Sequence, residues 1–279
     1  MGEPMNTQGL ARAARLLLLP FLILGFAPVA YSQARPSVFL EDLTWTELRD
    51  DIGAGKTTII VPIGGTEQNG PAMALGKHNR RVKLLSERIA VALGNALVAP
   101  VIAYVPEGSL NPPSGHMRFP GTISVPEAAF ETILEYSARS FKLHGFKDIV
   151  FLGDHGGYQA NEKTVASKLN REWAPSNVRA HAVRQYYDAA QLDFGRILKD
   201  QGFTPSQIGT HAGLNDISLM LALDPSLVRE DRLSDGTKFG SADGVYGDPT
   251  KASAKLGQLG VDAIVSQTVA AIKSAISRR

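Results

Sequence analysis

The strongest constraint on the fold is an alternation of short apolar runs and helical patterns along the chain. Apolar runs of strand length, the first of them the β-branched stretch TTIIVPI, occupy residues 57–63, 96–105, 148–152 and 178–183. Apolar residues at helical spacing occupy residues 80–93, 127–144, 159–173, 187–201, 215–222 and 261–277. Since parallel strands need long crossover connections, this order predicts an α/β fold, a three-layer αβα sandwich with a central, mainly parallel sheet.

The first 32 residues have the layout of a secretory signal peptide. Arg12 and Arg15 precede an apolar run over residues 16–29, and Ala30-Tyr31-Ser32 supplies small residues at the positions of a cleavage site. The run is shorter than the roughly 20 residues of a membrane-spanning helix. We therefore predict a signal peptide over residues 1–32, one domain over residues 33–279, a periplasmic or secreted location, and no membrane association after cleavage. An uncleaved anchor is the alternative.

Composition narrows the chemistry. The chain has 29 Lys and Arg against 27 Asp and Glu, and three of these charges lie in the leader, so the remainder is close to neutral. Without a basic excess we expect no nucleic-acid partner. The sequence contains no cysteine, which excludes disulfides and thiolate chemistry. Any metal must be bound by His, Asp or Glu.

Three polar segments follow predicted strands or open predicted helices. They are residues 67–78 (EQNGPAMALGKH), residues 154–157 (DHGG) and residues 211–216 (HAGLND). Active sites of parallel α/β sheets lie beyond the carboxyl ends of the strands. We therefore expect these segments to meet at one edge of the sheet and to form the functional site.

These segments carry a resemblance to the creatininase (creatinine amidohydrolase) family. Residues 67–78 resemble its motif Glu-x-His-Gly-Pro-His-Leu-Pro-Leu-x-x-Asp, and residues 116–122 (HMRFPGT) resemble His-x-x-Phe-Pro-Gly-Thr. Residues 153–158 (GDHGGY) are similar to Asn-Gly-His-Gly-Gly-Asn, and residues 211–218 (HAGLNDIS) to His-Ala-Gly-Glu-x-Glu-Thr-Ser. A late Gly-Val-x-Gly-Asp-Pro matches residues 244–249. The resemblance implies a three-layer αβα fold, a homo-oligomer that is often a hexamer, and metal-dependent hydrolysis of cyclic amides or related C–N bonds.

Two of the family's metal ligands are replaced in this chain. The resemblance implies that Glu67 and His155 are ligands, whereas Asn69 stands for a ligating His and His78 for an Asp that bridges two ions. An imidazole lone pair points at only one cation. We therefore predict a single divalent metal, zinc before manganese, held by Glu67, His78 and His155, the ligand set of several catalytic zinc sites.

Further roles are assigned to neighbouring residues. Asp216, Asp154 and His211 are predicted catalytic residues, with Asp216 as a fourth ligand or base and Asp154 orienting His155 or accepting a proton. His116, Asn69 and Gly157 are predicted to contact a small-molecule substrate. Amides of Gly64-Gly65 and Gly156-Gly157 are candidate donors to an oxyanion.

Two other hypotheses stay open at this point. The replacements at Asn69 and His78 are also consistent with a family member that has lost catalysis and binds a small molecule or serves a structural role. Catalysis without metal, with Asp154 or Asp216 as base, is the third hypothesis. His144, at the end of a helical pattern, and His181, in a strand, are not candidates.

Overall fold

The computed structural model describes residues 1–2, 37–234, 236 and 238–278. Pro36–Arg279 forms one compact unit, whereas residues 3–32 of the predicted signal peptide lie outside the described residues. Four parallel strands form its sheet, in the order β2-β1-β3-β4. The strands are β1 (Thr58–Ile63), β2 (Ala96–Val98), β3 (Asp148–Gly153) and β4 (Arg179–Ala182).

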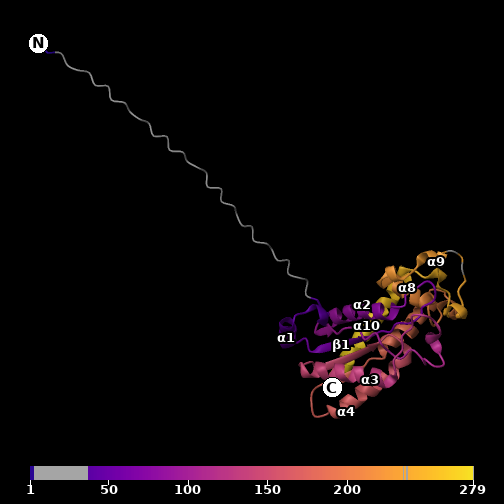
Figure 1. Ribbon diagram of the computed structural model, residues 1–279, viewed down its shortest axis with the longest axis horizontal. Helices are drawn as coiled ribbons and strands as arrows, with labels where there is room; N and C mark the ends of the chain where they lie inside the picture. Colours follow the sequence, from indigo (N-terminus) through magenta and orange to yellow (C-terminus); the bar gives the residue numbers. More distant parts are fainter. Residues whose placement is uncertain (3–36, 235, 237, 279) are drawn as a thin grey trace. The chain divides into compact units, whose positions relative to one another are not determined.

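Helices connect the strands as the alternating pattern predicts. They are α1 (Trp45–Gly53), α2 (Lys77–Leu93), α3 (Glu127–Leu143), α4 (Gln159–Glu172), α5 (Gln185–Asp188), α6 (Phe194–Asp200), α7 (Pro205–Ile208), α8 (Leu214–Leu223), α9 (Glu230–Ser234) and α10 (Ala254–Ser277). Figure 1 shows strand β1 between helices α2 and α10 on one side and helices α3 and α4 on the other. The helix predicted over residues 187–201 is divided by a π-helical segment, Ala189–Asp193. α2 ends at Gly94, whose φ of 81° is a left-handed C-cap that glycine adopts without strain.

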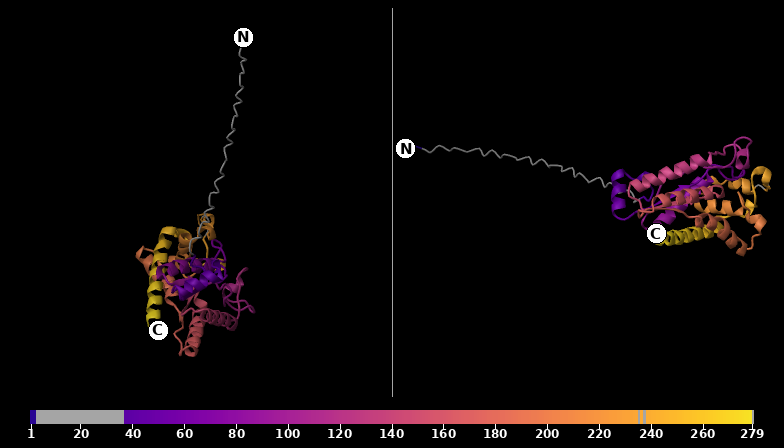
Figure 2. Two further views of the ribbon diagram at one scale, coloured as in Figure 1. Left: turned by 90° about the vertical axis from the view of Figure 1, so that its left-hand side faces the viewer. Right: turned by 90° about the horizontal axis from the view of Figure 1, so that it is seen from below.

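Two hydrophobic cores cover the two faces of the sheet. Ile60, Val150 and Leu152 face a core shared with α2, α6 and α10, and the alternate residues Ile59 and Phe151 face a core shared with α3 and α4. Figure 2 shows the yellow helix α10 on one side and the pink helices α3 and α4 on the other. The structure thus confirms the three-layer α/β fold, since both faces of its parallel sheet are buried under helices.

The second strand is shorter than predicted. It spans Ala96–Val98 instead of residues 96–105, and beyond it only an isolated bridge joins Ile63 to Ile102. Pro100 interrupts the run because it has no N–H to donate to a sheet ladder. The chain that follows becomes a long loop along the carboxyl edge of the sheet.

Of the described helices, α10 alone has the length and the apolar composition of a membrane span. It packs against α8, α2 and α6. Val261, Ile264 and Ile272 belong to the buried core, whereas Leu259 is exposed. One face of α10 therefore packs on the domain.

Candidate active site

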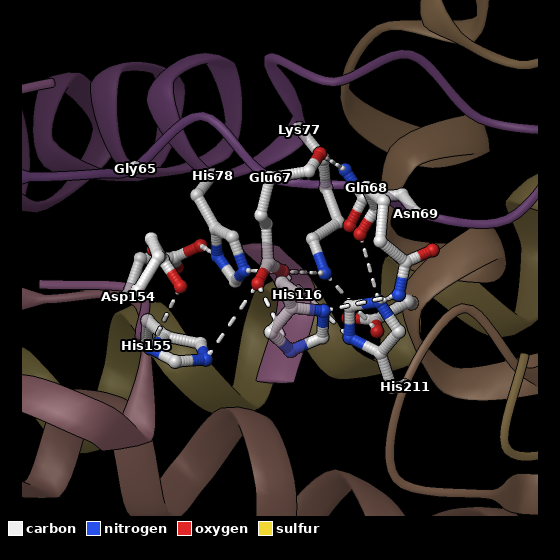
Figure 3. Close-up of polar contacts among 12 residues, drawn as sticks. Gly65, Glu67, Gln68, Asn69, Lys77, His78, His116, Asp154, His155 and His211 are labelled. Atoms are coloured by element: carbon white, nitrogen blue, oxygen red, sulfur yellow. Dashed lines mark hydrogen bonds and ion pairs between the residues drawn. The ribbon is translucent and has the colours of Figure 1, made fainter. Parts of the chain in front are cut away.

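The three polar segments meet beyond the carboxyl ends of β1 and β3, as expected for a parallel sheet (Figure 3). Glu67 lies four residues after β1, and His155 two residues after β3. His211 and Asp216 flank the start of α8, and His116 comes from the long loop after β2. Fully buried Glu67 lies at the centre of the group.

The carboxylate of Glu67 is surrounded by nitrogen atoms. His78 Nε2 hydrogen-bonds to Oε1 at 2.7 Å, and Lys77 Nζ lies 3.5 Å from the same oxygen. His116 Nε2 and His155 Nε2 lie 3.2 and 3.7 Å from Oε2, which has no hydrogen-bond partner among the described residues. Burial alone would raise the pKa of Glu67, but the charges of His78 and Lys77 hold it far below its usual range.

Buried cations from the first turns of α2 bind the other two carboxylates. Lys77 Nζ lies 3.2 Å from Asp216 Oδ2, and Arg81 Nη1 lies 2.6 Å from Asp216 Oδ1. Arg81 Nε donates to Asp154 at 2.8 Å, and the hydroxyl of Tyr186 donates to the same carboxylate at 2.6 Å. Burial opposes ionisation of both aspartates, but Arg81, with Lys77 at Asp216, lowers the pKa of each. The geometry thus favours positioning roles for Asp154 and Asp216 over the predicted role of base.

His78 does not face an open position for an ion. Its Nδ1 lies 2.5 Å from Asp154 Oδ2, and its Nε2 faces Glu67. Both ring nitrogens are therefore engaged by carboxylates. Two groups of donor atoms lie close together among the described residues, Glu67 with His116 and His211, and Glu67 with Glu107 and His155; His78 belongs to neither. The ligand set of Glu67, His78 and His155 stays a prediction.

The donor chemistry of these groups fits a divalent metal. Within each group the ligand atoms lie within 4.8 Å of one another, and ligands 2.0–2.2 Å from a tetrahedral ion are about 3.3–3.6 Å apart. Glu67 Oε2 and both oxygens of Glu107 are buried without hydrogen-bond partners among the described residues. Unpaired buried oxygens of this kind are costly unless a cation or proton joins them.

Glu107 was not anticipated from the sequence. It lies in the loop after β2, between two recognisable motifs, and is only 6% exposed. Burial and then the neighbouring charge of Glu67 raise the pKa of Glu107 to about 9. Lys77 and Arg81 were also missed, although their spacing with Leu85, at positions i, i+4 and i+8, places all three on one face of α2.

Gln68 holds two of the histidines in defined orientations. Its Oε1 accepts from the amide of Gly70, which directs Nε2 towards His116 Nδ1 at 3.0 Å. His211 Nε2 lies 2.9 Å from the carbonyl oxygen of Gln68, to which it donates. Burial lowers the pKa of both rings, that of His211 to about 4. His211 is therefore neutral at pH 7, with its Nδ1 lone pair free.

Two predicted substrate contacts have structural partners instead. Asn69 is 1% exposed and its amide donates to the carbonyl oxygens of Glu67 and Ala74. The amide of Gly157 donates to His155 Nδ1 at 3.2 Å. Neither residue lines the cavity described below. The amides of Gly64 and Gly65 are likewise engaged, by Ile102 and Asn79, and so are not free oxyanion donors.

A cavity of about 310 Å³ opens beside the histidines. This volume lies at the lower end of the range for small-molecule pockets. Six of the predicted site residues line it together with Lys77, and aromatic and polar residues complete the wall. The lining consists of Lys77, His78, His116, Asp154, His155, Tyr187, Gln191, Thr210, His211, Asp216 and Tyr246.

A three-layer αβα domain with buried carboxylates and histidines at the carboxyl edge of its sheet defines an α/β protein with a candidate metal-binding site. Within it, residues 41–272 match the model of the family described as Creatininase: Creatinine amidohydrolase. The chain belongs to the creatininase family.

Known proteins agree with this assignment. The chain is 29% identical over 208 residues to creatinine amidohydrolase of Pseudomonas putida, covering 71% of this chain and 76% of that protein. It is 29% identical over 224 residues to the mycofactocin precursor peptide peptidase of Mycolicibacterium smegmatis, covering 72% and 78%. A crystal structure of creatinine amidohydrolase (creatininase) superimposes with a TM-score of 0.72 at 27% identity, covering 87% of this chain and 99% of that one.

Proposed function

We propose that this protein is a metal-dependent hydrolase that cleaves the C–N bond of a small amide or lactam, with one divalent ion bound at Glu67. The observation that carries the proposal is the unpaired, buried Oε2 of Glu67, with ring nitrogens of His116 and His155 at 3.2 and 3.7 Å. The names of two relatives, an amidohydrolase and a peptide peptidase, denote hydrolysis of amide bonds. Zinc is the first candidate and manganese the second.

An ion bound here would polarise the amide carbonyl and lower the pKa of a bound water to about 7. His211 lines the cavity as a neutral ring, so its Nδ1 accepts a hydrogen bond or a proton from a substrate N–H or from water. Lys77 is the only Lys or Arg among the residues that line the cavity, and its ammonium would stabilise negative charge on the carbonyl oxygen. Asp216 and Asp154 hold Lys77, Arg81 and His78 in place.

A non-catalytic binding protein is the second candidate function. It is favoured by His78, which has both ring nitrogens on carboxylates, and by Lys77 and Arg81, which already neutralise Asp154 and Asp216. In that case the cavity would bind a small polar molecule without converting it. The two functions differ in their dependence on metal.

The test compares metal content with hydrolysis. The protein would be purified without chelator, analysed for elements, and assayed against creatinine, other lactams and short peptides, beside Glu67→Gln and His155→Ala. We expect about one zinc or manganese per chain, and loss of hydrolysis in both variants and after chelation. Full activity of metal-stripped protein, or unchanged activity of His155→Ala, would contradict the proposal. Ligand binding without turnover and without metal would favour the binding protein.

A further inference from the structure

Glu107 is a buried carboxylate without a partner. Its side chain is 6% exposed, and neither oxygen has a hydrogen bond among the described residues. Gly65, with a φ of +144°, passes directly beside it: a Cβ at Gly65 would lie 2.6 Å from Glu107 Oε1. The loop after β1 therefore leaves room for a carboxylate that no protein group satisfies.

Glu107 faces two other candidate ligands. Its Oε2 lies 3.8 Å from His155 Nδ1, while Glu67 Oε2 lies 3.7 Å from His155 Nε2. The donor atoms of Glu67, Glu107 and His155 all lie within 4.8 Å of one another. Two ionised carboxylates that face each other in a buried site repel unless a metal cation or a proton lies between them.

The centre holds more carboxylates than permanent cations. Its four carboxylates are Glu67, Glu107, Asp154 and Asp216, and its permanent cations are Lys77 and Arg81. Lys77 and Arg81 pair with Asp154 and Asp216, and His78 lies between Asp154 and Glu67. Glu107 pairs with no Lys or Arg among the described residues, and a cation between Glu107 and Glu67 would compensate its charge.

The two donor groups differ in their unpaired oxygens. The group of Glu67, His116 and His211 contains one buried carboxylate oxygen without a hydrogen-bond partner among the described residues, Glu67 Oε2, whereas the group with Glu107 adds both oxygens of Glu107. Gln68 also engages both histidines of the first group, at His116 Nδ1 and His211 Nε2. The group with Glu107 therefore offers a cation more unpaired oxygens.

We propose that Glu107 is a metal ligand, and that a single divalent cation is bound by Glu67, Glu107 and His155 while His116 and His211 serve the substrate. This inference rests on the proposed function and names the ligands of its ion. Glu107 takes the place that the sequence motifs led us to give to His78. His155 belongs both to this ligand group and to the wall of the cavity, so the proposed ion would lie next to the cavity.

The test is titration of the metal-stripped full chain with Zn²⁺ and Mn²⁺ by calorimetry, followed by elemental analysis. Four variants would be compared with wild type: Glu107→Gln, Glu107→Asp, His211→Ala and the exposed control Glu230→Gln. We expect Glu107→Gln to weaken binding at least ~100-fold, as removal of a direct ligand should exceed the 10- to 100-fold loss seen for outer partners. His211→Ala and Glu230→Gln should bind the metal as wild type does, because neither residue is a ligand in this proposal. Circular dichroism and Tm without metal check that each variant is folded.

The outcomes distinguish failure of this inference from failure of the proposed function. Unchanged binding by Glu107→Gln with lost binding by His211→Ala would overturn the role of Glu107 and assign the ion to Glu67, His116 and His211, leaving the proposed function intact. Absence of binding in wild type would overturn both. If Glu107→Gln does not fold, Glu107→Asp takes its place. Weakened metal binding by Glu107→Asp supports the proposal. Wild-type affinity of Glu107→Asp, together with Mn²⁺ density away from residue 107 in its crystal structure, rejects the proposal.

Discussion

The ammonium of Lys77 lies 3.2 Å from Asp216 Oδ2 with both side chains buried. Neither charge can be hydrated, so each depends on the other, and Lys77 also faces Glu67 at 3.5 Å. Removing one partner leaves an uncompensated buried charge, which is more costly than the net gain from the pair.

Lys77→Met should therefore destabilise the protein by about 3–5 kcal/mol, measured as the free energy of unfolding in urea. Lys83→Met is the matched control, because Lys83 pairs with Glu41 on the surface, where such a pair contributes about 0–1 kcal/mol. Equal losses in the two variants would show that Asp216 and Glu67 do not depend on Lys77.

His78→Asp should make the fold depend on metal. His78 separates Glu67 from Asp154 and contacts both, so an aspartate there would put three carboxylates side by side. We expect a lower Tm than wild type in chelator and a larger rise in Tm on addition of Zn²⁺ or Mn²⁺, since a ligand that binds only the folded state stabilises it. His78→Asn, which adds no charge, is the control. An equal metal-induced rise in the Tm of His78→Asp and His78→Asn would contradict this prediction.

Glu162 should make stability fall as pH rises. It is buried, its Oε1 has no partner among the described residues, and burial raises its pKa from 4.5 to about 8. Below about pH 4.5 Glu162 is protonated in both the folded and the unfolded protein. Between about pH 4.5 and 8 it is protonated only in the folded protein, so its ionisation favours unfolding. Folding thus loses about 1.4 kcal/mol per pH unit in this window, or about 3 kcal/mol by pH 7.

Glu162→Gln should flatten this slope in urea titrations from pH 5 to 8, whereas Glu230→Gln, at an exposed position of α9, should leave it unchanged. A slope that is the same in wild type and Glu162→Gln would mean that Glu162 is ionised in the folded protein.

Gly257→Ala should be strongly destabilising because α10 crosses α8 at this residue. A Cβ at Gly257 would lie 1.8 Å from the carbonyl oxygen of Ser218, a backbone atom that cannot rotate away. We expect a loss of about 3 kcal/mol or more, at the upper end of overpacking costs, measured by thermal or urea unfolding. Gly195→Ala in α6 is the same change with nothing within 4 Å, and should be neutral or stabilising by up to about 1 kcal/mol. A tolerated Gly257→Ala would mean that the two helices can separate.

The sequence was informative where its signal is local or periodic. The β-branched run before Gly64 and the spacing of Val82, Leu85 and Ile89 predicted β1 and α2, and strand ends placed Glu67 beside His155. The motifs identified the family because its loops keep their order in the chain. The predicted export and homo-oligomer stay predictions.

The site was harder to predict because side-chain direction is set by tertiary contacts. His78 occupies a ligand position of the motif, but its orientation follows from Asp154, which is 76 residues away. Glu107 lies outside every motif, and its burial beside Glu67 becomes visible only in the folded chain. Asn69 looked like a pocket residue, yet it fixes the loop between Glu67 and Ala74.

Lys77, His78 and Arg81 all belong to the first two turns of α2. One helix therefore brings the counter-charges of Glu67, Asp154 and Asp216 into the domain as it docks, before any ion arrives. The empty protein should then be as well ordered as the loaded one, unlike small zinc domains that unfold without metal. A preparation with a sharp melting transition and no activity would accordingly indicate an unloaded enzyme, and adding metal, not refolding, would be the remedy.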